Sequence, residues 1–82
     1  MEKNKVIGIL GLGSMGKIIA RDLYNTFSGQ VIYLVRDINS VKSLAKKYLA
    51  EIRYADVSKS ETLVKAFNGI DVVIHAVHHE FN

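Results

Sequence analysis

The chain has 82 residues, 49% of them hydrophobic and 23% charged, and carries a formal net charge of +3. A chain of this length holds one small domain, and its apolar content is too high for a disordered segment. The lack of cysteine excludes disulfides and thiolate metal sites. No apolar run reaches the roughly 18 residues of a membrane span, and the 11 Lys and Arg residues are scattered. We therefore expect one cytoplasmic domain with no bound metal, nucleic acid or membrane.

Short apolar runs alternate with segments of helical periodicity. Runs at residues 6–10, 31–35 and 72–77 do not alternate with polar residues, which is typical of strands buried on both faces of a parallel sheet. Residues 52–55 form a weaker fourth run, which we expect at an edge. Parallel strands need crossover connections, and helices would supply them.

Apolar residues recur at helical spacing in the three intervals between these runs. The stripes are Met15, Ile18, Ile19, Leu23 and Phe27; Val41, Leu44, Ala45, Tyr48 and Leu49; and Leu63, Val64 and Phe67. The order β-α-β-α-β-α-β predicts an α/β, Rossmann-like doubly wound parallel sheet. Because such sheets have roughly six strands, we expect residues 1–82 to be the N-terminal portion of a larger dinucleotide-binding domain.

The most specific motif is residues 11–16, Gly-Leu-Gly-Ser-Met-Gly, which match G-x-G-x-x-G. The motif follows a predicted strand and opens a predicted helix, the context that marks a dinucleotide site. Gly11 would allow a tight turn, Gly13 would let a pyrophosphate approach the backbone, and Gly16 would let the helix pack closely. The first amides of the helix would bind the phosphates, and the Ser14 hydroxyl would add a donor.

The end of the second predicted strand would lie beside the adenosine ribose of a bound dinucleotide. If the strand ends at Val35, Arg36 is placed to bind a 2′-phosphate, which favours NADP. If it extends two residues further, Asp37 would bind the ribose hydroxyls, which favours NAD. Asp37 lies 21 residues after Gly16, close to the usual spacing of about 20. We favour NADP and keep NAD as the alternative.

The ends of the third and fourth strands supply the remaining candidates. Asp56 would accept a hydrogen bond from the adenine amino group, with Val57 against the ring, or would instead cap the following helix. Ala76 and Val77 end the fourth strand, where the backbone would pass close to the cofactor.

Together these motifs resemble the NAD(P)-binding N-terminal domain of the saccharopine dehydrogenase-like family, and are also similar to atypical short-chain and β-hydroxyacid dehydrogenases. The resemblance rests on residues 11–16, 35–37, 43–45, 55–58, 63–67 and 69–74. It implies an NAD(P)-dependent oxidoreductase that transfers hydride to or from a small metabolite such as an amino acid or imine.

The resemblance also implies roles for individual residues. It implies Gly11, Gly13, Ser14, Met15 and Gly16 at the pyrophosphate, Arg36 at the ribose phosphate, and Asp56 and Val57 beside adenine. No catalytic residue can be transferred, and the substrate would bind through a region absent from this chain.

A second class of function stays open, namely a non-catalytic nucleotide-sensing module that binds NAD or ATP, as found on potassium transport systems. Asp37 would carry the binding in such a module, whereas Arg36 carries the preference for NADP in an oxidoreductase. An unpaired edge of the sheet would also permit a homo-oligomer.

Overall fold

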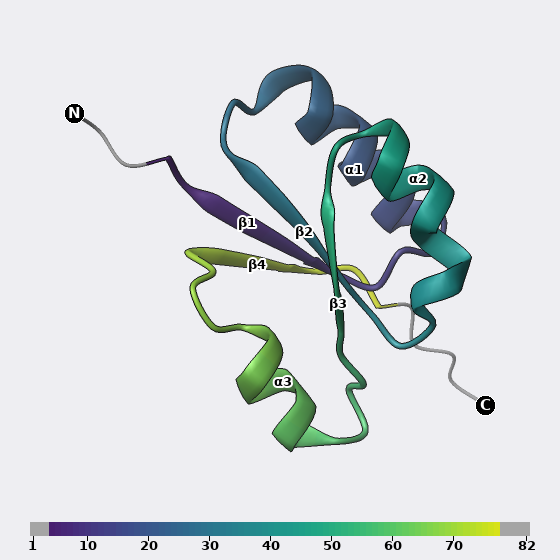
Figure 1. Cartoon of the computed structure of the whole chain (residues 1–82), viewed down its shortest axis with the longest axis vertical. Coiled ribbons are helices and arrows are strands. Elements are labelled where there is room, and N and C mark those ends of the chain that lie inside the picture. The colour runs from purple at the N-terminus through teal and green to yellow at the C-terminus, as the bar shows by residue number, and fades with distance from the viewer. Residues whose placement is uncertain (1–3, 78–82) are drawn as a thin grey trace.

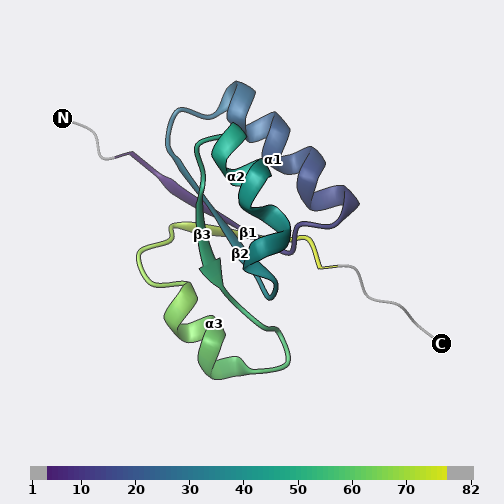
Figure 2. The same ribbon diagram turned by 45° about the vertical axis from the view of Figure 1, so that its right-hand side comes forward.

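The computed structural model describes residues 4–77 of the chain. The elements are β1 (Val6–Leu10), α1 (Ser14–Thr26), β2 (Gln30–Val35), the 3₁₀ helix η1 (Ile38–Val41), α2 (Lys42–Lys47), β3 (Glu51–Tyr54), α3 (Ser60–Ala66) and β4 (Val72–His75). The strands form one parallel sheet in the order β3-β2-β1-β4. Helices α1 and α2 cover one face and α3 covers the other (Figures 1 and 2). This arrangement is the predicted Rossmann-like α/β fold.

The two central strands supply the most deeply buried side chains of the described residues. Ile9, Ile32, Tyr33 and Leu34 are each less than 2% exposed. Because side chains alternate along a strand, Ile9 and Tyr33 pack beneath α1 and α2, whereas Ile32 and Leu34 pack on the α3 side. Burial on both faces explains the continuous apolar runs of β1 and β2.

Strands β3 and β4 form the two edges of the sheet within residues 4–77. The edge position of β3 was predicted, and its Arg53 donates to the carbonyl oxygens of Ala66 (2.9 Å) and Asn68 (2.7 Å) at the end of α3. The prediction that residues 72–77 form a fully buried strand is wrong for the described part of the sheet. Strand β4 ends at His75, and Val72 is 52% exposed because no strand covers that side.

The face of α1 that contacts the sheet matches the predicted stripe only in part. Ile19 and Leu23 pack against the core, but Met15 is 65% and Ile18 52% exposed. Gly16 and Ala20 are buried instead, because their small size brings the helix axis close to the sheet. No helix among residues 4–77 is long and apolar enough to cross a membrane.

Candidate functional site

The turn after β1 is shaped by two glycines that the protein's own packing requires. Gly11 has φ 93°, a conformation that favours glycine, and its amide donates to the carbonyl oxygen of Leu34 at 3.0 Å. A Cβ on Gly16 would lie well inside 3.0 Å of the carbonyl oxygen of Gly11. The helix α1 can therefore begin directly against the turn only because Gly16 has no side chain.

Gly13 differs from these two glycines because a Cβ added to it would meet nothing within 4 Å. Gly13 is the N-cap of α1, and its carbonyl oxygen accepts the first helical hydrogen bond, from the amide of Lys17 at 2.9 Å. The amides of Ser14, Met15 and Gly16 therefore precede the first helical bond and have no partner in the helix. Three free donors at the positive end of a helix dipole, with open space above Gly13, form a site suited to an anion.

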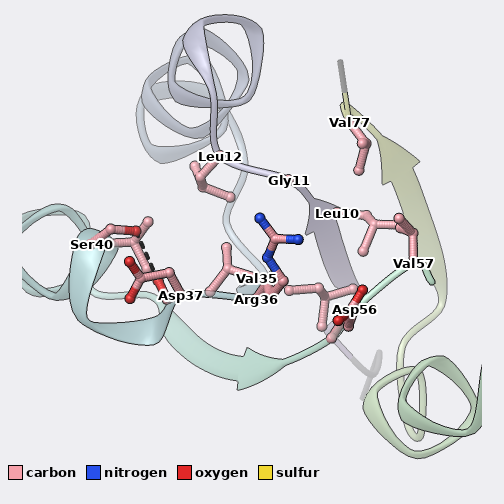
Figure 3. Close-up of a pocket in the computed structure, with 13 residues that line it drawn as sticks. Leu10, Gly11, Leu12, Val35, Arg36, Asp37, Ser40, Asp56, Val57 and Val77 are labelled. Carbon is pink, nitrogen blue, oxygen red and sulfur yellow. Dashed lines mark hydrogen bonds between the residues drawn. The ribbon is translucent and has the colours of Figure 1, made fainter. Parts of the chain in front are cut away.

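A cavity of about 440 Å³ lies beside this turn, at the carboxyl ends of the strands (Figure 3). Thirteen residues line it: Leu10, Gly11, Leu12, Leu34, Val35, Arg36, Asp37, Ser40, Val41, Ala55, Asp56, Val57 and Val77. The structure thus brings together six of the residues singled out from the sequence, which are Gly11, Arg36, Asp37, Asp56, Val57 and Val77. The cavity has an apolar floor and a charged rim.

The other candidates lie outside this lining. Gly13, Ser14 and Met15 are exposed on the turn, while Gly16 and Ala76 are buried. Most of the lining residues that the sequence analysis missed are apolar residues at the ends of strands. They could have been found by including the last residue of each predicted strand among the site candidates. Ser40 had no such signal, because it reaches the cavity through η1, which the periodicity did not predict.

Arg36 and Asp37 occupy different parts of the cavity rim. The strand β2 ends at the buried Val35, and Figure 3 shows the Arg36 guanidinium projecting over the cavity. Among the described residues, Arg36 forms no ion pair or hydrogen bond. Asp37 is the N-cap of η1, and its main-chain carbonyl oxygen accepts a hydrogen bond from the Ser40 hydroxyl at 2.8 Å. Its carboxylate lies on the Ser40 side of the cavity (Figure 3).

Asp56 is the one charged residue that is buried in the described part of the chain. Its Oδ1 accepts hydrogen bonds from the Ser58 hydroxyl at 2.7 Å and from the Ser58 amide at 3.0 Å. These bonds lower the pKa of Asp56, against the effect of its own desolvation, and the charges of Lys59 and Arg36 act in the same direction as the bonds. The cavity therefore contains a carboxylate that stays ionised at neutral pH.

The alternative role considered for Asp56, capping of the next helix, is wrong. The helix α3 begins at Ser60, with Lys59 at its N-cap and no side-chain capping bond. Asp56 instead closes a turn of its own with Ser58, and its main-chain amide donates to the Thr62 hydroxyl at 2.9 Å. The turn thus holds the carboxylate at the cavity, and the bond to Thr62 ties the turn to α3.

Comparison with known proteins agrees with this geometry. The family described as shikimate / quinate 5-dehydrogenase matches residues 1–81. Saccharopine dehydrogenase (L-Glu forming) from Saccharomyces cerevisiae has a similar structure, with a TM-score of 0.78 and 24% identity over 90% of this chain and 17% of that chain. PbgP3 protein from Burkholderia pseudomallei gives a TM-score of 0.71 and 20% identity over 89% of this chain and 22% of that chain.

The two solved structures show the fold alone, and this chain spans about a fifth of their length. The fold resemblance to saccharopine dehydrogenase that the motifs predicted is confirmed. The family match covers nearly the whole chain. The chain is therefore an NAD(P)-binding Rossmann-like domain that belongs to the shikimate / quinate 5-dehydrogenase family.

Proposed function

We propose that this chain binds NADP(H) in preference to NAD(H), as the cofactor-binding part of an oxidoreductase that transfers hydride to or from a small metabolite. The observation that carries the preference is the place of Arg36. It follows the buried end of β2 directly, projects over the cavity and forms no ion pair or hydrogen bond among residues 4–77. A guanidinium in this position is free to form charge-assisted hydrogen bonds with a 2′-phosphate.

The glycine turn would hold the pyrophosphate, whichever dinucleotide binds. The free amides of Ser14, Met15 and Gly16 point out of the start of α1, and Gly13 leaves the approach to them open. Because these donors belong to the backbone, they contribute affinity and do not distinguish NADP from NAD.

The adenine would lie at the other end of the cavity, near Asp56 and Val57. The apolar floor supplies a surface for the ring, and Val57 is half exposed there. The ionised Asp56 carboxylate is an acceptor for the adenine amino group, since Ser58 occupies only its Oδ1. The bound cofactor would then supply the hydride chemistry, and this chain would bind and orient the cofactor.

The family description favours a substrate of the shikimate or quinate kind, and the amino acid or imine predicted from the motifs is the alternative. The substrate contacts would come from a further region, because this chain spans only about a fifth of the solved proteins that it resembles. No described residue is assigned a catalytic role.

Calorimetric titration with NADPH and with NADH tests the proposal. We expect NADPH to bind more tightly, and Arg36→Gln to weaken NADPH roughly 10- to 100-fold, as the loss of hydrogen bonds to a charged group predicts, with little effect on NADH. Lys65→Gln is the matched control, because Lys65 is exposed on α3 and does not line the cavity.

Two results would contradict the proposal. If NADH binds more tightly and Asp37→Ala abolishes binding while Arg36→Gln does not, the site is an NAD site of the kind expected in a sensing module. If neither dinucleotide binds or raises the melting temperature at millimolar concentration, the chain does not bind these cofactors.

A further inference from the structure

Positive charge gathers on one layer of the molecule, although it is scattered in the sequence. The helices α1 and α2 carry five exposed cations (Lys17, Arg21, Lys42, Lys46 and Lys47) and one carboxylate, Asp22. The two helices lie side by side in both views (Figures 1 and 2), and the rings of Tyr24 and Tyr48 are 5.0 Å apart where they meet. Their cations therefore act as one charged surface, which we name the α1–α2 layer.

The opposite layer, formed by α3 and the loops beside it (residues 56–71), has no such excess. Lys59 and Lys65 are there accompanied by Asp56, Glu61 and Asp71. The molecule is thus electrically polarised across the sheet, with its positive side on the α1–α2 layer.

The α1–α2 layer is continuous with the cavity. The helix α1 starts three residues after Gly11, and Lys42 directly follows Val41, which lines the cavity. Arg36 lies between the two helix starts in the sequence and projects over the same cavity. The positive surface of the layer therefore lies next to the cavity, whose own charged residues are Arg36, Asp37 and Asp56.

None of these five cations lines the cavity. Lys46 is four residues beyond Lys42, or about 6 Å along the helix axis. The Debye length at physiological ionic strength is about 8 Å, so such a charge still acts on an anion at the rim. Arg21 has its nearest carboxylate, Asp22, at 3.8 Å, and both side chains are exposed, so this pair neutralises little of the field.

We propose that the α1–α2 layer attracts the anionic dinucleotide electrostatically and guides it to the cavity, so that it raises the association rate without touching the bound cofactor. The inference rests on the proposed function, since it needs a dinucleotide bound in that cavity. The pyrophosphate and 2′-phosphate supply the negative charge on the ligand. A surface field of one sign beside a binding cleft accelerates the association of an oppositely charged ligand and is weakened by salt.

Stopped-flow measurement of NADPH association by its fluorescence tests this inference. The variant Arg21→Gln/Lys46→Gln removes two charges from the layer, away from the cavity lining. The control Lys5→Gln/Lys65→Gln removes the same net charge from exposed positions outside the layer. We expect the layer variant to reduce the association rate constant by about threefold near 0.02 M salt, and the difference to vanish near 0.5 M salt. The control should lose clearly less, and the dissociation rate constant should stay unchanged in both.

The possible outcomes separate this inference from the proposed function. Binding with equal association rates in the layer variant and the control, or a change confined to the dissociation rate, would overturn the steering role and leave the NADP site standing. A complete lack of NADPH binding by the unmodified chain would overturn both.

Discussion

The two sides of the cavity present different chemistry to a ligand. The turn at residues 11–16 offers backbone amides and the space that glycine leaves, so its recognition does not depend on any side-chain charge. The opposite side offers the charged side chains of Arg36, Asp37 and Asp56, which would distinguish one ligand from another under the proposed function. If the proposed function is right, affinity would come from the glycine turn and selectivity from the charged side of the cavity. Substitutions on the first side should affect all dinucleotides equally, and substitutions on the second should separate them.

The largest effect is expected for Gly13→Val. An added side chain fills the open space above the free amides, so binding of both NADPH and NADH should fall about 100-fold, the loss of about 2.7 kcal/mol of hydrogen bonding to the phosphates. The fold should persist, since a Cβ at Gly13 meets no atom within 4 Å. Calorimetry measures the binding, and circular dichroism checks the fold.

Gly16→Ala is the counterpart that sharpens this result. Its Cβ would overlap the carbonyl oxygen of Gly11, so the free energy of unfolding should fall by about 1–3 kcal/mol, as for an overpacked core. If Gly13→Val proves as destabilising as Gly16→Ala, or if it lowers the affinity for only one dinucleotide, the assignment of Gly13 to a ligand is wrong.

On the charged side of the cavity, Asp37→Asn should sharpen the preference for NADP. Its carboxylate lies at the rim and would repel a 2′-phosphate if the neighbouring Arg36 binds one as proposed. Removing one exposed charge should strengthen NADPH binding by about 1 kcal/mol or less, or roughly threefold, and leave NADH unchanged or weaker. Paired calorimetric titrations measure the ratio. A fall in affinity for both dinucleotides would instead identify Asp37 as a ribose-binding residue.

The fold was predictable from sequence because its signals are local. The apolar run of β1 (Val6–Leu10) matches the predicted strand residue for residue, and the glycine turn follows it as expected. The exposed face of α1 was not predictable, because it depends on how far Gly16 and Ala20 let the helix approach the sheet. The position of Ser40 was also not predictable, because the 3₁₀ helix that carries it is too short to show a periodic pattern in the sequence.

The charged part of the site was predicted in its residues and only partly in their roles. Arg36, Asp37 and Asp56 were chosen because each follows a strand, and parallel strands bring their carboxyl ends to one edge. The turn that fixes Asp56 depends on hydrogen bonds from Ser58, which the sequence pattern presented equally as a helix start. The role of Asp56 therefore depends on hydrogen bonds that form only in the folded structure.

Ser58→Ala tests whether that turn keeps the Asp56 carboxylate ionised. Without the Ser58 hydroxyl, the pKa of Asp56 should rise toward its ordinary value, which carboxyl NMR titration measures. A lowered pKa in the folded state stabilises it above the unfolded pKa of about 3.9, and this contribution disappears as the pH falls through the lowered value. The difference in unfolding free energy between the unmodified protein and the Ser58→Ala variant should therefore be largest at neutral pH and shrink below about pH 4. A difference that does not vary with pH would show that the Ser58 hydroxyl acts on stability by another route.

The smallest effect is expected for Tyr33→Phe, which separates two kinds of unpaired polar group. The Tyr33 hydroxyl is buried and has no hydrogen-bond partner within residues 4–77, and burial, with a smaller effect of Tyr48, raises its pKa to about 12. Unlike the turn at residues 11–16, Tyr33 lies away from the proposed site and does not line the cavity, so its removal should leave NADPH binding unchanged. Losing an unsatisfied buried hydroxyl should raise the free energy of unfolding by about 1 kcal/mol or less.

The pH dependence of stability gives the same substitution a second signature. The unfolded tyrosine ionises near pH 10, whereas the folded one resists ionisation until about pH 12, so the unmodified protein loses stability as the pH rises above about 10. Tyr33→Phe should lose less stability over this range in urea unfolding. A destabilised variant would show that the hydroxyl has a partner, and a variant with weaker NADPH binding would show that the core beneath α1 and α2 is coupled to the site.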